Sequence, residues 1–183
     1  GSKIVVRNML YNQTRNGFLK TLKKMGGNIV IKNKRSVHNE IIADIYVNQR
    51  KNLKAIKVSA TEIPQQIDEI PILSIAAAFA NGETIFNGLK ELTVKESDRL
   101  SLIYLNLKKI GVKCAIKNYD LHIHGSNNLK KGGANIIHNF DHRILMSFYI
   151  SNLICLKSNK ITDKLCVKTS YPEFFEDFKM LLG

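Results

Sequence analysis

The sequence lacks any long run of apolar residues, and it has neither a secretory signal pattern nor a low-complexity tail. A helix that crosses a bilayer needs about 20 consecutive, mostly apolar residues, so these absences argue against a membrane-spanning protein. We therefore expect a soluble, cytoplasmic protein with no membrane partner. No long polar linker divides the 183 residues, which suffice for one sizeable core, so we expect a single domain over residues 1–183.

Cysteine is scarce, and its spacing matches no metal or redox motif. Cys114, Cys155 and Cys166 are far apart in the sequence, whereas such motifs place thiols two to four residues apart. We interpret them as reduced structural thiols. His122 and His124 lie on one face of a predicted strand and could bind a metal, but no third ligand is near, so we interpret them as exposed strand residues and expect no metal site.

Positive charge is abundant but scattered. The formal net charge of +13 points to an anionic partner, such as a nucleic acid, an anionic membrane or a small polyanionic substrate. The lysines form no long basic run and no basic stripe interleaved with aromatic residues, which is the pattern of many nucleic-acid-binding proteins. We therefore interpret most of them as solvated surface residues and expect no nucleic-acid partner.

An internal repeat organises the chain. "LKKMGGNIVIK" (22–32) and "LKKIGVKCAIK" (107–117) share a pattern in which lysines close a helix, Gly26 or Gly111 ends it, and an alternating strand follows. A further short strand follows each copy. Helices are predicted at about 14–25, 68–80, 98–110, 142–156 and 171–182. The chain is thus predicted to be an α/β protein built from duplicated strand–helix–strand–strand modules.

The stretch "ELTVKESDRL" (91–100) contains a charge in an unfavourable place. Residues 91–94 read as the end of a strand, and a helical pattern begins near Leu100. Ser97 or Asp98 is a suitable N-cap. Arg99 then lies in the first turn of the helix, where the helix dipole disfavours a cation unless a negative charge lies beside it. An anion is therefore expected next to Arg99.

Two further helix starts carry charged side chains. Asp68 is a candidate N-cap for a helix with Pro71 in its first turn, where the missing N–H costs little. Asp141 is a candidate N-cap for a nearly all-apolar helix, with His142 and Arg143 in its first turn. The pattern is equally consistent with both aspartates being caps alone and with both being functional groups, and it does not decide between these interpretations.

Together these helix starts predict an anion site. A helix N-terminus with an added guanidinium offers backbone N–H groups, a favourable dipole and bidentate donors to an anion. Arg99 and Arg143 both have this placement, and the carboxylates of Asp68 and Glu96 accompany them. This combination suits chemistry on a substrate that carries phosphate or carboxylate groups.

Four ordered motifs carry a resemblance to a known family. They are "IDEIPILSIAAAFANGETIFNG", "LTVKESDRL", "DHRILMSF" and "SYPEFFEDF", together with the earlier "NQTRNGFLKTLKKMGG". With them the chain resembles the later part of the 5-enolpyruvylshikimate-3-phosphate synthase family, covering most of its second domain. The resemblance implies repeated βαβαββ units with helices inside and sheets outside. It also implies that the N-terminal domain, which supplies most shikimate contacts, is absent.

The resemblance implies which residues bind the substrates of this family. Arg99 and Arg143 would bind phosphoenolpyruvate, chiefly its carboxylate, with His142 nearby. Lys168 would lie near the phosphate, although family members differ at this position. Lys95 would contact shikimate 3-phosphate.

The resemblance also implies the catalytic residues. Asp68 would contact shikimate 3-phosphate and take or orient the proton of its 5-hydroxyl, and Glu96 would protonate the methylene carbon of phosphoenolpyruvate. No cofactor and no metal would take part. The implied enzyme is a monomeric transferase of the shikimate pathway, which leads to chorismate and the aromatic amino acids. Because half of the site is missing, the 183-residue chain alone is expected to be inactive.

Three alternatives remain open from the sequence. A UDP-N-acetylglucosamine enolpyruvyl transferase would share the fold and the chemistry, although "KESDR" and "DHR" together are not expected in it. A nucleic-acid-binding module of the same fold type would account for the net charge. A truncated gene product, folded but inert, would account for the missing domain.

Overall fold

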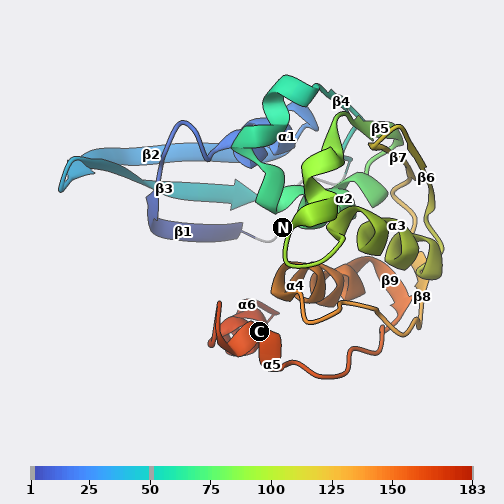
Figure 1. The fold of residues 1–183 in the computed structure, drawn as a ribbon. Coiled ribbons are helices and arrows are strands. Elements are labelled where there is room, and N and C mark those ends of the chain that lie inside the picture. Colours follow the sequence, from blue (N-terminus) through green and yellow to red (C-terminus); the bar gives the residue numbers. More distant parts are fainter. Residues whose placement is uncertain (1–2, 50–51, 183) are drawn as a thin grey trace.

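The computed structural model describes residues 3–49 and 52–182 (Figure 1). The strands are β1 (Lys3–Leu10), β2 (Asn28–Val37), β3 (Glu40–Asn48), β4 (Lys57–Val58), β5 (Gly82–Phe86), β6 (Lys113–Lys117), β7 (Asp120–Gly125), β8 (Lys130–Gly132) and β9 (Cys155–Lys157). The α-helices are α1 (Gly17–Lys24), α2 (Ile70–Ala78), α3 (Arg99–Lys109), α4 (His142–Ile150), α5 (Leu165–Lys168) and α6 (Phe174–Leu182). The 3₁₀ helices are η1 (Ala60–Gln65), η2 (Ile67–Glu69), η3 (Leu89–Val94) and η4 (Ser151–Ile154).

The middle of the chain forms one complete βαβαββ unit. Its elements follow one another as β4, α2, β5, α3, β6 and β7, and the strands form a sheet in the order β4-β5-β7-β6. The pair β4/β5 is parallel, because a helix connects these strands, whereas β5/β7 and the hairpin β6/β7 are antiparallel.

Parts of the same unit recur on either side. The elements β1, α1, β2 and β3 match the last four elements of the unit, and their sheet order β1-β3-β2 repeats the order β5-β7-β6 with the same antiparallel pairings. The elements β8, α4, β9 and α6 match the first four, and β8/β9 is parallel as β4/β5 is. This confirms the predicted duplicated modules and the α/β fold class.

The two predicted glycine stops are confirmed. Gly26 and Gly111 follow the C-caps of α1 and α3 with φ of +92° and +88°, a left-handed conformation that glycine adopts without strain. In each copy two backbone hydrogen bonds close the helix end. In the first copy the N–H groups of Gly26 and Gly27 donate to the carbonyl oxygens of Lys23 and Leu22, respectively. The equivalent bonds of the second copy run from Gly111 and Val112 to Lys108 and Leu107. This is the Schellman arrangement in both copies.

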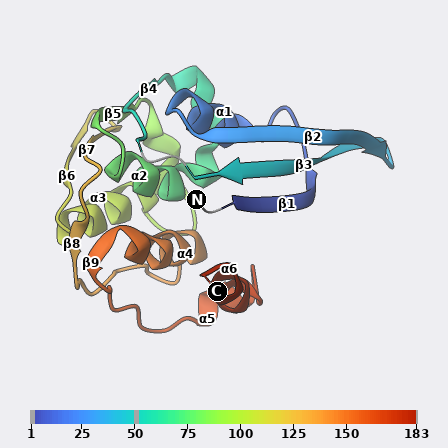
Figure 2. The same ribbon diagram turned by 180° about the vertical axis from the view of Figure 1, so that it is seen from behind.

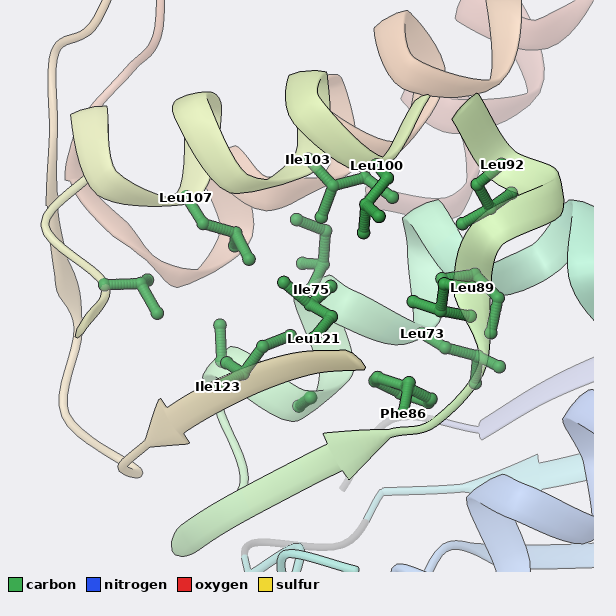
Figure 3. Packing of buried hydrophobic residues seen from close by; sticks show 14 of the residues in the cluster. Leu73, Ile75, Phe86, Leu89, Leu92, Leu100, Ile103, Leu107, Leu121 and Ile123 are labelled. Atoms are coloured by element: carbon green, nitrogen blue, oxygen red, sulfur yellow. The ribbon is translucent and has the colours of Figure 1, made fainter. Parts of the chain in front are cut away.

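Helices lie in the interior and sheets on the outside. In Figures 1 and 2 the helix α2 lies between the three-stranded and the four-stranded sheet, with α3 and α4 beside it. Helix α2 contacts α1, α3, α4 and β7. Its sequence, IPILSIAAA, is apolar on every side, so it is stable only where all its faces are covered. Figure 3 shows the side chains of α2 and α3 packed against those of β5, β7 and η3.

Two predicted elements differ in type. Residues 91–94 were expected to end a strand but belong to the 3₁₀ helix η3. Leu89 and Leu92, three residues apart, are both buried on one side of η3, while Val94 is 77% exposed, and this spacing suits a helical turn better than a strand. Residues 155–156, expected at the end of a helix, belong instead to the strand β9.

The predicted helix bounds also need correction. The helix expected at 68–80 consists of η2 followed by α2, and that expected at 142–156 ends at Ile150 and continues as η4. The helix expected from 171 begins at Phe174, since the residue before Pro172 is disfavoured in helical conformation. The short helix α5 was not predicted. In the described ranges, no helix has the length and apolar character needed to span a membrane.

Candidate active site

Two helix N-termini meet at the buried carboxylate of Asp141. As the N-cap of α4, its Oδ1 accepts hydrogen bonds from the backbone N–H groups of Arg143 (2.9 Å) and Ile144 (3.2 Å). Its Oδ2 accepts hydrogen bonds from Nε of Arg99 (2.8 Å) and Oγ of Ser97 (2.9 Å), at the start of α3. Asp141 has no exposed surface. The predicted N-cap is confirmed, and the same carboxylate also joins α4 to α3.

The start of α3 is capped as predicted. Asp98 Oδ1 accepts a hydrogen bond from the backbone N–H of Ser101 at 3.0 Å. Asp98 is therefore the N-cap, and Ser97 is free to bond to Asp141 instead.

The guanidinium of Arg99 is held by three carboxylates. Arg99 is completely buried. Besides the bond to Asp141, its Nη1 lies 3.2 Å from Asp68 Oδ1, and its Nη2 donates to Glu96 Oε2. Burying an unpaired charge costs on the order of several kcal/mol per ion. Arg99 can be buried because these carboxylates pair with its charge. The negative charge expected beside Arg99 is supplied here by the chain itself.

Asp68 lies between arginines and does not cap α2. It belongs to η2, and the N-cap position of α2 is Glu69, whose side chain makes no capping bond. The Oδ2 atom of Asp68 lies 3.5 Å from Arg15 Nη2 and 3.8 Å from Arg143 Nη2. Arg143 Nη1 also donates a hydrogen bond to the backbone carbonyl oxygen of Asp68 at 3.1 Å. The N-cap reading of Asp68 was wrong because its carboxylate is used by Arg99 and these two arginines.

Two carboxyl groups of this cluster have pKa values shifted in opposite directions. Burial raises the pKa of Glu69, partly offset by the charge of Arg143, whose Nη1 lies 3.7 Å away, while neighbouring Asp68 raises it further. Burial also acts to raise the pKa of Asp141, but the hydrogen bond and charge of Arg99, with bonds from Ser97 and from the α4 N-terminus, lower it below its usual value. Asp141 is therefore a fixed anion.

A cavity of about 220 Å³ opens beside the cluster. Asp68, Glu69 and Arg143 lie at one end of it, and the remaining walls are formed by Ile72, Met146, Ser147, Ile150, Tyr171 and Phe174. The Arg143 side chain is 32% exposed, whereas Arg99 has no exposed surface. Of the two arginines, Arg143 is the one that an external anion can reach without rearrangement.

The structure brings together only some of the predicted site residues. Asp68, Glu96, Arg99 and Arg143 form the cluster described above. Lys95 pairs instead with Glu91, four residues before it. The remaining two, His142 and Lys168, make no side-chain hydrogen bond or ion pair within the part of the chain that the structure describes; His142 is half-buried and Lys168 is exposed on α5.

Sequence reasoning missed three features of the cluster. Arg15 and Glu69 were not proposed as site residues, and for Asp141 the pattern left open whether it is a cap alone or a functional group. Arg15 lies in "NQTRNG" (12–17), a stretch already noted for its resemblance, which was the available signal. The pairing of Arg99 with Asp141 spans 42 residues, and nothing local in the sequence indicates it.

The two histidines of β7 share a carboxylate on the outer sheet. His122 Nδ1 lies 3.1 Å and His124 Nε2 3.3 Å from Glu83 Oε1, and their side chains are 15% and 43% exposed. Across residues 3–49 and 52–182, no three His, Cys, Asp or Glu side chains are grouped so as to hold a metal ion.

Sequence comparison identifies relatives over nearly the whole chain. The family profile described as EPSP synthase (3-phosphoshikimate 1-carboxyvinyltransferase) matches residues 1–178. A 3-phosphoshikimate 1-carboxyvinyltransferase of Aquifex aeolicus is 44% identical over 176 residues, which are 96% of this chain and 40% of the relative. That of Thermoanaerobacter sp. (strain X514) is 40% identical over 98% of this chain and 42% of its own length. The chain thus spans about two fifths of the length of these curated relatives.

Solved structures are also similar to this chain over nearly its whole length. An EPSP synthase from Acinetobacter baumannii superposes with a TM-score of 0.93 and 36% identity, covering 99% of this chain and 42% of that chain. The enolpyruvyl transferase NikO from Streptomyces tendae superposes with a TM-score of 0.70 at 14% identity, covering 98% and 39%, which shows a shared fold.

Proposed function

Because the chain belongs to the EPSP synthase (3-phosphoshikimate 1-carboxyvinyltransferase) family, we propose that it is the C-terminal part of such an enzyme. The complete enzyme would transfer the enolpyruvyl group of phosphoenolpyruvate to the 5-hydroxyl of shikimate 3-phosphate and release phosphate. The observation that carries this proposal is that separate family motifs converge on one cluster. Asp68, Glu96, Arg99 and Arg143, from three such motifs, lie in direct contact there.

Phosphoenolpyruvate would be bound by the arginine end of the cluster. Arg143 is partly exposed at the polar end of the cavity and would donate two parallel hydrogen bonds to the substrate carboxylate. Arg99 would become available through its Nη2 group once Glu96, whose side chain is 52% exposed, turns away from it. His142, adjacent to Arg143, and Lys168 would complete the anion contacts, the latter near the phosphate.

Glu96 and Asp68 would move the protons. In this proposal Glu96 protonates the methylene carbon of phosphoenolpyruvate, and the neighbouring carbon becomes an oxocarbenium-like centre. The 5-hydroxyl oxygen attacks that carbon while Asp68 takes the hydroxyl proton. Loss of phosphate, together with a proton from the new methyl group, then forms the enol ether.

Shikimate 3-phosphate would be held between this chain and the N-terminal domain of the complete enzyme. Lys95 and Asp68 would be the contacts from this side. The Lys95 side chain is about one quarter exposed and is paired with Glu91, so it can be turned toward an anion at small cost.

The 183 residues would act as a single domain of a monomeric, cytoplasmic enzyme. The support for one domain is that its three apolar clusters share members. Phe18 and Leu22 pack against both the central cluster and that of the three-stranded sheet, and Ile161 packs against both the central and the C-terminal cluster.

The direct test is an assay of the full-length enzyme with both substrates. We expect stoichiometric formation of phosphate and 5-enolpyruvylshikimate 3-phosphate. UDP-N-acetylglucosamine in place of shikimate 3-phosphate should give no phosphate. The reverse preference would contradict the proposed substrate.

A further inference from the structure

We propose that Asp141 is a positioning residue that fixes the guanidinium of Arg99 relative to Arg143, so that the two arginines form one anion site. This inference rests on the proposed function, since it concerns the binding of phosphoenolpyruvate. It assigns to Asp141 a role that is distinct from capping α4.

The two oxygens of Asp141 serve two different helices. Oδ1 accepts both of its bonds from backbone N–H groups at the start of α4, one of them from Arg143 itself. Oδ2 accepts both of its bonds from side chains at the start of α3, namely those of Arg99 and Ser97. Because the carboxylate is planar and rigid, this arrangement fixes the distance and angle between the two helix starts.

Capping alone does not account for this geometry. An N-cap needs one acceptor oxygen, and Oδ1 fills that role completely. The second oxygen faces a fully buried Nε–H, and only a carboxylate offers acceptors in both directions. An asparagine here could still cap α4 through its Oδ1, but its NH₂ group would then face the Nε–H of Arg99, with donor against donor.

The other partners of Arg99 cannot replace Asp141. The side chain of Glu96 is half-exposed, and within the described part of the chain its carboxylate bonds to Arg99 alone, so it is the partner that a substrate anion can displace. Asp68 is shared with Arg143 and Arg15. Asp141 is wholly buried and keeps Nε in place when Nη2 is released. Arg99 should therefore meet an incoming carboxylate in a fixed orientation.

The test compares two Asp→Asn variants in the full-length enzyme. Asp141→Asn keeps the α4 cap but loses the acceptor for Arg99, and Asp98→Asn is the matched control, because Asp98 is the N-cap of α3 and does not contact the guanidinium. We expect Asp141→Asn to raise the KM for phosphoenolpyruvate by roughly 10- to 100-fold, and Asp98→Asn to leave it within about twofold.

The KM change separates positioning from structure. A merely structural role would reduce the amount of folded enzyme, which lowers the apparent kcat and leaves both KM values unchanged. In the positioning role the KM for shikimate 3-phosphate should stay within about threefold while that for phosphoenolpyruvate rises. Equal phosphoenolpyruvate KM values for the two variants would overturn the proposal.

A spectroscopic measurement keeps the inference independent of the assigned reaction. In NMR spectra of the 183-residue chain, the Arg99 Nε–H resonance should exchange slowly with solvent, and this protection should be lost in Asp141→Asn but kept in Asp98→Asn. If the wild-type enzyme shows no turnover, the proposed function is wrong, but the NMR exchange measurement still tests whether Asp141 holds the Arg99 guanidinium. If Asp141→Asn does not fold, the wild-type chain still tests the inference, because rapid exchange of the Arg99 Nε–H with solvent would show that the bond to Asp141 Oδ2 does not hold the guanidinium and would overturn the proposal.

Discussion

At the scale of single residues, Arg99 and Arg143 have similar places in the sequence but very different environments. Each lies in the first turn of a helix. Arg99 has no exposed surface and three carboxylate partners, whereas about one third of the Arg143 side chain is exposed at a cavity. We therefore expect Arg99 to contribute to stability as well as to any binding, and Arg143 to contribute chiefly to binding.

Alanine substitutions should separate these contributions. Removing one partner of a buried charge cluster typically costs about 3–5 kcal/mol, so Arg99→Ala should lower the free energy of unfolding of the 183-residue chain by that order. Arg143→Ala should cost less than about 1 kcal/mol, because exposed pairs contribute little. Urea unfolding monitored by circular dichroism gives both values. Equal losses of unfolding free energy in the two variants would contradict the structural role assigned to the buried Arg99.

In the full-length enzyme the Arg143 variant should show a binding defect. Loss of a charged hydrogen bond of about 1.5–3 kcal/mol would raise the KM for phosphoenolpyruvate, with the fold retained. The matched control is Arg35→Ala, since Arg35 is an exposed arginine of β2 whose guanidinium donates to Asn8 and to the backbone of Asn33, away from the cluster. A wild-type KM in the Arg143 variant would remove Arg143 from the binding site.

Glu96 has two possible roles, and glutamine distinguishes them. If Glu96 only pairs with Arg99, Glu96→Gln should leave turnover nearly intact, because an amide oxygen can still accept from Nη2. If Glu96 is the acid, kcat should fall by about 10²- to 10⁴-fold with substrate binding largely kept. Deuterium exchange from solvent into the methylene of phosphoenolpyruvate should fall in parallel.

The control for this variant is Glu176→Gln, an exposed glutamate of α6. It should exchange deuterium and turn over at the wild-type rate. A Glu96→Gln enzyme that also exchanges at the wild-type rate would exclude Glu96 as the acid and leave Asp68 or the N-terminal domain to supply the proton.

The residue-scale predictions from sequence succeeded where the cause was local. The caps Asp98 and Asp141 follow from their position just before a helix, and both are confirmed. Asp68 has the same local pattern but was misread, because its partner Arg99 is 31 residues away. Which charges pair across such distances depends on how helices pack, and this information is not contained in the local pattern.

At the scale of elements, sequence predicted the repeated modules and misjudged several of their ends. The α1–β2 and α3–β6 copies were identified because lysine-rich helix ends, glycine stops and alternating strands leave distinct local patterns. The 3₁₀ helices η3 and η4 were missed because short apolar turns resemble strand ends or helix continuations. Boundaries of this kind are set by tertiary packing, as the burial of Leu89 and Leu92 shows.

The glycine stop of α3 allows a test at this scale. Gly111 has a φ of +88°, and a Cβ placed there would lie 3.1 Å from the Cβ of Lys131. Left-handed backbone costs a residue with a Cβ about 1–2 kcal/mol, and the close contact adds to it. Gly111→Ala should therefore destabilise the chain by at least this amount in urea unfolding. Gly111→Asn should lose less, since asparagine tolerates this conformation better. A neutral alanine variant would contradict the assigned helix end.

At the scale of the whole molecule, the repeat explains why the cluster forms. Equivalent units pack their inner helices side by side, and the starts of α3 and α4 come together at Asp141 while η2, just before α2, supplies Asp68. Each unit contributes charged groups from its own helix start. A site of this kind arises from the arrangement of the units, so it could be anticipated from the family motifs but not from any single segment.

The cluster contains the arginines proposed to bind phosphoenolpyruvate and the two carboxyl groups proposed to move protons, yet we expect the 183-residue chain alone to be inactive. Holding two reactants in a productive geometry is worth about 7–11 kcal/mol of the barrier, and one face of a two-sided site cannot do so. Purified chain incubated with phosphoenolpyruvate and shikimate 3-phosphate should release no phosphate above background, while the full-length enzyme under the same conditions should. A cooperative urea transition of the same sample is the control that the chain is folded. Formation of 5-enolpyruvylshikimate 3-phosphate by the folded chain would mean that all the essential groups lie within residues 1–183, and the role given to the N-terminal domain would be wrong.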